Sequence, residues 1–311
     1  MNAASTEAAA TAAGALQLSR RQWVVLVLLT LVWGVNWPVM KLGVSGWPAA
    51  PQAYPPLTFR ALSMVLGLPV LWLALKILRV PLAIPRAHWP EVLRLTPTNL
   101  LVWHIVVIFG VQALSSGRAA ILGYTMPIFV ALAGYFVYGE RLAARHWLGV
   151  AAAALGVALL LSEEFGKLAG APWAAAAVVG AAAVWALGTH MLRRSTAPVP
   201  LLAMVFWMTV ITAVVMCALA VLLERAHWRV PAPHVWFAVV FNAVLVFGFS
   251  QAAWLYLART LPPVASSISV MMIPVLGVFS GAVVLGEKLH WQDWAAVAAI
   301  VCAIALVLRR P

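Results

Sequence analysis

Ten long apolar segments follow one another along this chain of 311 residues, separated by short clusters of charged residues, proline and glycine. A run of about 20 apolar residues is long enough to cross the hydrocarbon core of a bilayer as a helix. A helix satisfies its backbone hydrogen bonds within the segment, as lipid requires. The sequence therefore predicts an all-α integral membrane protein, with spans at residues 21–42, 58–78, 92–112, 117–138, 143–162, 173–192, 199–223, 234–257, 262–285 and 290–308.

The composition agrees with this prediction and excludes two other classes of protein. Apolar residues make up 65% of the chain and charged residues 9%, whereas a soluble protein carries about 25% charged residues. The net charge is +12, but the basic residues occur singly or in pairs at span ends and form no stripe that would bind nucleic acid. The basic residues are therefore interpreted as signals of topology.

The distribution of these basic residues predicts the orientation of the chain. If the N-terminus is cytoplasmic, 13 of the 20 Lys and Arg residues fall on the cytoplasmic side and the remaining seven on the other, as the positive-inside rule favours. Both termini are then cytoplasmic. The first span has no small-residue cleavage site and is interpreted as uncleaved. Residues 1–20 are expected to be a disordered tail.

A repeated pattern divides the chain into two halves. Residues 119–142 align with 266–289 at a constant offset of 147, which pairs Pro127 with Pro274, Gly139 with Gly286 and Glu140 with Glu287. The halves are predicted to be residues 21–162 and 173–308, with five helices each. Because five is odd, the second half inserts upside down relative to the first. Inverted halves are typical of alternating-access carriers, whose substrate site lies at the repeat interface near the midplane.

These features resemble a known family. Ten helices in two halves, short basic loops, a Pro…Gly-Glu-x-Leu pattern closing the fourth and ninth helices, and a Leu-Val-Trp-Gly sequence in the first helix are similar to the EamA type of the drug/metabolite transporter superfamily. The sequence Trp-Gly-Val-Asn-Trp-Pro at residues 33–38 most resembles the YddG-type exporters of aromatic and other amino acids. The resemblance implies a bacterial inner-membrane exporter with a central cavity between the halves.

Polar side chains deep in a span are costly and are therefore candidates for function. His104 lies midway along the third span, and at the 147-residue offset its partner is Gln251 in the eighth span. Asn36 offers an amide in the first span. We expect these side chains to face the substrate; the alternative is that they hold helices together by hydrogen bonds.

Aromatic residues inside spans form a second group of candidates. We expect an aromatic box that holds an apolar side chain by stacking, made of Trp33, Trp185, Trp254 and Tyr124; packing against lipid is the alternative. Three prolines free backbone carbonyls within spans and are interpreted as gating bends or as tolerated kinks, namely Pro38, Pro127 and Pro274.

Four other residues are assigned no place in the site. Trp103 adjoins His104 and points about 100° away from it, so we expect it to pack outward. Arg60 and Arg118 lie near span ends and are expected to reach the membrane surface, with attraction of a carboxylate as the alternative. His190 is expected to reach the boundary as well.

All eight acidic residues lie in the tail, in loops or at span ends. A carrier that exchanges organic cations for protons needs a buried carboxylate, so a neutral or zwitterionic substrate is predicted. The predicted function is export of amino acids with apolar side chains by facilitated diffusion, in a monomer without metal or cofactor. The alternative is export of another metabolite or drug, coupled to protons through His104. No constellation at span depth supports an enzyme.

Overall fold

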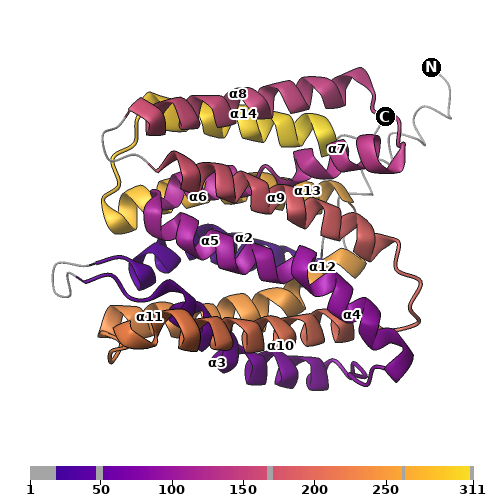
Figure 1. Cartoon of the computed structure of the whole chain (residues 1–311). Coiled ribbons are helices and arrows are strands. Elements are labelled where there is room, and N and C mark those ends of the chain that lie inside the picture. The colour runs from indigo at the N-terminus through magenta and orange to yellow at the C-terminus, as the bar shows by residue number, and fades with distance from the viewer. Residues whose placement is uncertain (1–18, 47–51, 167–170, 261–262, 309–311) are drawn as a thin grey trace, which may run out of the picture.

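The chain folds into helices that run side by side along one direction (Figure 1). The computed structural model describes residues 19–46, 52–166, 171–260 and 263–308, and all regular secondary structure in these ranges is helical. The α-helices are α2 (Arg20–Val44), α3 (Pro56–Ile77), α4 (Trp89–Thr96), α5 (Val102–Ala113), α6 (Ser116–Gly123), α7 (Met126–Tyr138), α8 (Ala144–Gly166), α9 (Pro172–Arg193), α10 (Leu201–Leu219), α11 (Pro233–Phe241), α12 (Gln251–Thr260), α13 (Pro263–Leu285) and α14 (Trp291–Leu308).

Shorter helical segments connect several of these elements. Two 3₁₀ turns are η1 (Arg86–His88) and η4 (Arg225–His227), and three π-helical segments are η2 (Pro97–Leu101), η3 (Ala220–Glu224) and η5 (Asn242–Ser250). The predicted tail lies outside the described residues as far as residue 18, and Ser19 then caps α2. Its Oγ accepts the backbone N–H of Gln22 while the Gln22 side chain accepts that of Ser19, so two N–H groups without a partner inside the helix are satisfied.

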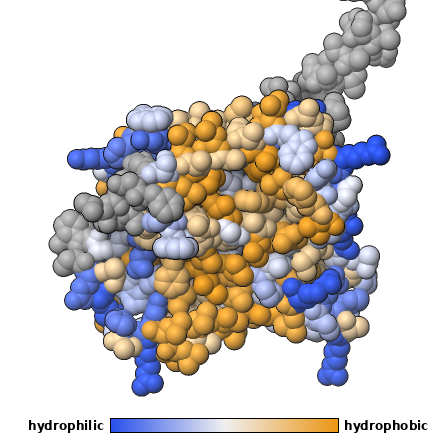
Figure 2. Space-filling view, turned by 45° about the horizontal axis from the view of Figure 1, so that its top comes forward, coloured by the Kyte–Doolittle hydropathy of each residue, from blue (hydrophilic) through white to orange (hydrophobic). Residues whose placement is uncertain are grey.

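Eight helical stretches are long and apolar enough to cross a membrane, and two shorter apolar helices, Met272–Leu285 and Trp291–Leu306, coincide with the ninth and tenth predicted spans. Figure 2 shows an apolar surface between two ends where the hydrophilic side chains gather. The prediction of an all-α membrane protein is therefore confirmed for the described residues. The count of ten crossings and the cytoplasmic position of the termini stay predictions.

The repeated Gly-Glu pair ends a helix in each half. Gly139, after α7, has φ 69°, and Gly286, after α13, has φ 65°, a left-handed conformation that glycine adopts without steric cost. The next residue then folds back, because the N–H of Glu140 donates to Gly134 O at 2.9 Å and that of Glu287 to Gly281 O at 3.4 Å. The motif therefore places one carboxylate at the same point of each half.

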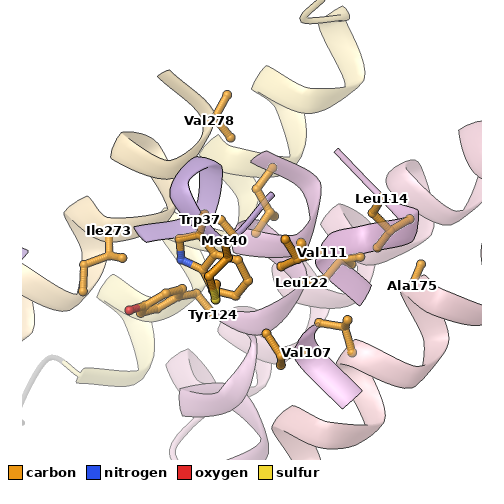
Figure 3. Packing of buried hydrophobic residues seen from close by; sticks show 14 of the residues in the cluster. Trp37, Met40, Val107, Val111, Leu114, Leu122, Tyr124, Ala175, Ile273 and Val278 are labelled. Atoms are coloured by element: carbon orange, nitrogen blue, oxygen red, sulfur yellow. The ribbon is translucent and has the colours of Figure 1, made fainter. Parts of the chain in front are cut away.

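Helices of one half pack directly against helices of the other half. Helix α2 lies along α13 and α11, while α9 lies along α5, α6 and α7. Helix α3 packs on η5 and α10, and α8 pairs with α14 at one side of the bundle (Figure 1). Side chains from both halves share one core, in which Trp37, Met40 and Tyr124 lie near Ile273 and Val278 of α13 (Figure 3). The interface between the halves is therefore the centre of the protein.

Carboxylates of the second half hold helix ends of the first. Glu224 accepts the backbone N–H groups of Leu57 and Thr58 in the first turn of α3, at 2.9 and 2.7 Å, and the Thr58 hydroxyl at 2.7 Å. Negative charge is stabilised at a helix N-terminus by the dipole and by N–H groups that lack intrahelical partners. Glu287 does the same at α6. These contacts couple the halves at the end of the bundle where α6 begins.

Candidate functional site

Two helix faces from different halves meet at the centre. On α2, Trp33, Asn36 and Met40 follow at helical spacing and share one face. Facing them are η5 and α12, which both pack on α2. The ring of Trp33 lies 5.6 Å from that of Trp254, centroid to centroid, at an interplanar angle of 41°. Thus two of the four aromatic residues of the predicted box come together.

The two predicted polar partners each follow a π-helical segment. His104 lies just after the π-helical segment η2, and Gln251 directly follows the π-helical segment η5. Wide π turns of this kind are rare and occur often at functional sites. Both side chains are partly buried. The predicted position of His104 and Gln251 at similar depth across one cavity stays a prediction.

Two polar side chains lie near the ring of Phe247 in η5. Together with Phe247, His104 and Arg60 form what we call the Phe247 cluster. The His104 ring centroid lies 5.4 Å from that of Phe247, and the guanidinium carbon of Arg60 lies 5.9 Å from it. Arg60 also donates from Nη1 to Asn242 Oδ1 at 3.3 Å and from Nη2 to Met40 Sδ at 2.8 Å. A cation above an aromatic face is stabilised by the ring quadrupole.

The expectation that Arg60 and Arg118 reach the membrane surface is wrong. Their side chains are buried, with exposed fractions of 2% and 4%. Arg118 Nε pairs with the buried Asp293 at 2.8 Å, whereas Arg60 faces the cluster around Phe247. Arg60 lies near the end of its span, so sequence position alone favoured the surface.

Asn36 and Gln251 complete the polar surface. Asn36 is 9% exposed, and its Oδ1 is buried without a hydrogen-bond partner. An unsatisfied buried acceptor costs about 1–3 kcal/mol, which a ligand donor at this place would recover. Gln251 lies between Phe247 and Trp254 along one side of the η5–α12 helix, and its side chain is partly buried.

The other two aromatic residues of the predicted box make other contacts. Tyr124 packs edge-on against Trp37, with ring centroids 6.3 Å apart. Trp185 is partly buried, and its backbone carbonyl accepts the hydroxyl of Thr189 at 3.0 Å. The expectation that Trp103 packs outward is wrong, because a Cβ on Gly123 would lie between the rings of Trp37 and Trp103, at 2.8 and 3.2 Å.

The three prolines have different surroundings. Pro38 lies inside α2, and Pro274 inside α13, and both helices continue through them. Pro127 follows a break instead: α6 ends at Gly123 and α7 begins at Met126. The symmetry-related fourth and ninth spans are thus broken in one half and continuous in the other.

His190 lies near the end of the bundle as expected, but its side chain is buried and does not reach outward. It is 4% exposed, and its Nε2 lies 2.8 Å from Val130 O. The ring stacks on Tyr138 at 4.8 Å, and Nδ1 lies 4.0 Å from the carboxylate of Glu140. Glu140 also lies 3.8 Å from Arg194. This group closes the end of the bundle where α9 ends, away from the site.

None of the described acidic residues forms an ion pair with Arg60. Glu224 and Asp293 are buried, but each is engaged at a helix end, with α3 and with Arg118 respectively. Among the residues that the structure describes, no three His, Cys, Asp or Glu side chains come close enough to hold a metal ion. The site therefore offers aromatic faces, uncharged polar groups and one arginine.

Comparison with known proteins identifies the family. The EamA-like transporter family matches residues 21–162 and again residues 172–309, which together span nearly all of the described helices. The chain belongs to the EamA-like transporter family. It is therefore a multi-pass membrane transporter, and this family is not one of enzymes.

Several relatives cover most of the chain. The uncharacterized inner membrane transporter YedA of Escherichia coli (strain K12) is 28% identical over 91% of this chain and 89% of its own. The uncharacterized transporter YoaV of Bacillus subtilis (strain 168) is 26% identical over 85% and 88%. A probable amino-acid metabolite efflux pump of E. coli K12 is 23% identical over 88% and 89%.

A solved crystal structure shares the fold. It superposes with a TM-score of 0.63 and covers 93% of this chain and 96% of that one, at 22% sequence identity. The two-repeat architecture of EamA-like transporters rests on the two family matches, one in each half of the chain.

Proposed function

We propose that this EamA-like transporter exports amino acids with apolar, neutral side chains by alternating access. The observation that carries the proposal is the pair of facing surfaces between the halves, where the rings of Trp33 and Trp254 lie 5.6 Å apart next to the polar side chains of Asn36 and Gln251. An apolar side chain stacks on the tryptophans, and the amides bind the amino and carboxyl groups of the substrate.

The energy source in this proposal is the substrate gradient. Coupling of a cationic substrate to protons requires a carboxylate at span depth, and the buried carboxylates that the structure describes are engaged at helix ends. Facilitated diffusion needs only that each half release its contacts in turn. The proposal places the protein in a bacterial inner membrane with both termini cytoplasmic, as a monomer.

Two observations on relatives support the substrate class. A relative with 23% identity bears the name of a probable amino-acid metabolite efflux pump, and a second of the same name in Salmonella typhimurium (strain LT2) is also 23% identical. The sequence Trp-Gly-Val-Asn-Trp-Pro in α2, which resembles the YddG-type exporters, supplies Trp33 and Asn36 of the site.

Counterflow in proteoliposomes tests the proposal. Vesicles are loaded with unlabelled Phe, Trp, Met or Leu, and uptake of the labelled amino acid is compared with uptake of organic cations and with empty vesicles. We expect amino-acid counterflow without an imposed ion gradient. Uptake of cationic drugs with none of the four amino acids would contradict the substrate class.

The energy source has its own test. Uphill transport driven by an imposed pH gradient, lost in His104→Ala, would replace facilitated diffusion by proton coupling. His104 is the candidate for this role because its ring lies in the Phe247 cluster, 5.4 Å from Phe247. Unchanged counterflow rates across a pH series in both proteins support the uniporter.

A further inference from the structure

The two buried arginines of the described chain have different partners. Arg118 Nε lies 2.8 Å from the carboxylate of Asp293, and both side chains are 5% exposed. Arg60 is equally buried, at 2% exposure, but no carboxylate of the described residues lies within ion-pair distance of it. A buried cation without a counter-charge is strongly destabilising. Burial of Arg60 therefore lowers the stability of the fold, and a role in packing alone does not explain an arginine at this position.

The hydrogen bonds of Arg60 are incomplete as well. A guanidinium carries five N–H donors, and here one meets the amide oxygen of Asn242 at 3.3 Å and one the sulfur of Met40 at 2.8 Å. Thioether sulfur is a weak acceptor. Nε is buried and has no partner. At least one donor of the buried cation is therefore left for a ligand.

The carboxylate that binds the first turn of α3 does not pair with Arg60. Glu224 binds the first turn of α3, where its oxygens accept the N–H groups of Leu57 and Thr58 and the Thr58 hydroxyl. Its carboxylate is thus engaged with the helix end, one turn before Arg60. The same end of the bundle therefore contains a carboxylate that is engaged with a helix end and a guanidinium that has no carboxylate partner among the described residues.

We propose that Arg60 binds the carboxylate of the transported substrate, so that a carboxylate is the group that the site requires. The planar guanidinium matches a carboxylate in geometry, through parallel N–H···O bonds. Phe247 and His104 flank the anion, and Trp33 and Trp254 lie further along the same two helix faces, where a side chain extends. The substrate class is then carboxylic acids and zwitterions with an apolar tail, and amines without a carboxylate are excluded.

This inference rests on the proposed function for the place of the site, but binding tests it separately. The full chain, purified in detergent, is titrated with three matched probes: L-phenylalanine, 3-phenylpropionate and 2-phenylethylamine. The isobutyl series, L-leucine, 4-methylpentanoate and 3-methylbutylamine, repeats the comparison with an aliphatic tail. Binding is read as the shift of the thermal unfolding midpoint, since a ligand of the folded state raises it. Chloride at matched ionic strength is the probe for a bare anion.

The same titrations are repeated with Arg60→Gln, Arg60→Lys and the control Arg229→Gln. Arg229 lies at the same end of the bundle, is exposed, and bonds to Gln52. We expect the acid and the amino acid, but not the amine, to stabilise the wild type and the control. Arg60→Gln loses at least tenfold in affinity for both, and Arg60→Lys, which keeps the charge but not the planar fork, binds with intermediate affinity.

Several outcomes overturn the inference. These are an amine that binds the wild type as tightly as the amino acid, carboxylate binding that Arg60→Gln retains, chloride alone reproducing the shift, or no shift with any probe. A variant that fails to fold is replaced by Arg60→Lys, whose midpoint without ligand gives the control for folding. If carboxylates bind through Arg60 while counterflow moves no amino acid, the proposed function fails and this inference stands. If amino acids and amines are transported alike, the proposed function stands and this inference fails.

Discussion

Glu287 holds Ser116, the first residue of α6, from the other half of the chain. Its Oε1 accepts the backbone N–H of Ser116 at 2.7 Å, and its Oε2 accepts the Ser116 hydroxyl at 2.9 Å. The N–H of Gly117 adds a third bond at 3.3 Å. The equivalent carboxylate of the first half, Glu140, instead lies 4.0 Å from His190 and 3.8 Å from Arg194.

This difference predicts unequal effects of the same substitution at the two ends. Glu287→Gln removes the charge from three donors at a helix N-terminus, which we expect to lower the free energy of unfolding by about 1.5–3 kcal/mol. Glu140→Gln, at a half-exposed carboxylate, lowers it by about 0–1 kcal/mol. Chemical denaturation in mixed micelles measures both. Equal effects would contradict the role of Glu287 as the cap of α6.

The ion pair between Arg118 and Asp293 predicts a double-mutant result. Removal of one partner leaves a buried charge unpaired, so Arg118→Met or Asp293→Leu alone destabilises by about 3–5 kcal/mol. The double variant recovers much of this loss, because neither charge remains. Folded yield and unfolding midpoint are the measurements. A double variant no more stable than the worse single one would show that the pair is not the main interaction of either residue.

The tryptophan pair predicts a loss of substrate affinity. Trp254→Ala removes the ring that faces Trp33, and we expect the KM for counterflow of an aromatic amino acid to rise roughly threefold to tenfold, as an aromatic pair contributes about 0.5–1.5 kcal/mol. Gln251→Ala affects KM in the same direction. Trp173→Ala is the control, since Trp173 is 87% exposed. Unchanged KM in Trp254→Ala and Gln251→Ala would place the substrate elsewhere.

The broken fourth span predicts that its proline matters more than that of the ninth. Pro127→Ala restores an N–H donor next to the break between α6 and α7, so a continuous helix becomes more favourable. Pro274→Ala changes α13 less, because that helix already continues through residue 274. We expect the maximal counterflow rate to fall severalfold in Pro127→Ala and less in Pro274→Ala. The opposite order would remove the break from the gating cycle.

Predictions based on repeats and local pattern agree well with the structure. The Gly-Glu pairs at residues 139–140 and 286–287 end helices in both halves. Both glycines have a positive φ, which is a local property of the backbone and can be predicted from the sequence. The helical spans likewise follow from runs of apolar residues. The predicted pairing of His104 with Gln251 across one cavity stays a prediction.

Predictions about where a side chain points were less successful. Arg60 near a span end was expected at the surface, and Trp103 was expected to pack outward. Depth along a helix can be read from the sequence, but the neighbour that covers a given face depends on how the helices pack against one another. Of the four residues in the predicted aromatic box, Trp33 and Trp254 meet, and Tyr124 packs on Trp37 instead.

The sequence by itself determined that the chain is a bundle of membrane helices in two related halves, because hydrophobic length and repeated motifs are local properties. Only the tertiary structure decided that Arg118 pairs with a carboxylate, while Arg60 has no carboxylate partner among the residues that the structure describes. Arg118 and Asp293 are 175 positions apart in the sequence, and Arg60 and its hydrogen-bond partner Asn242 are 182 apart. Such contacts form only when the helices of the two halves pack against one another.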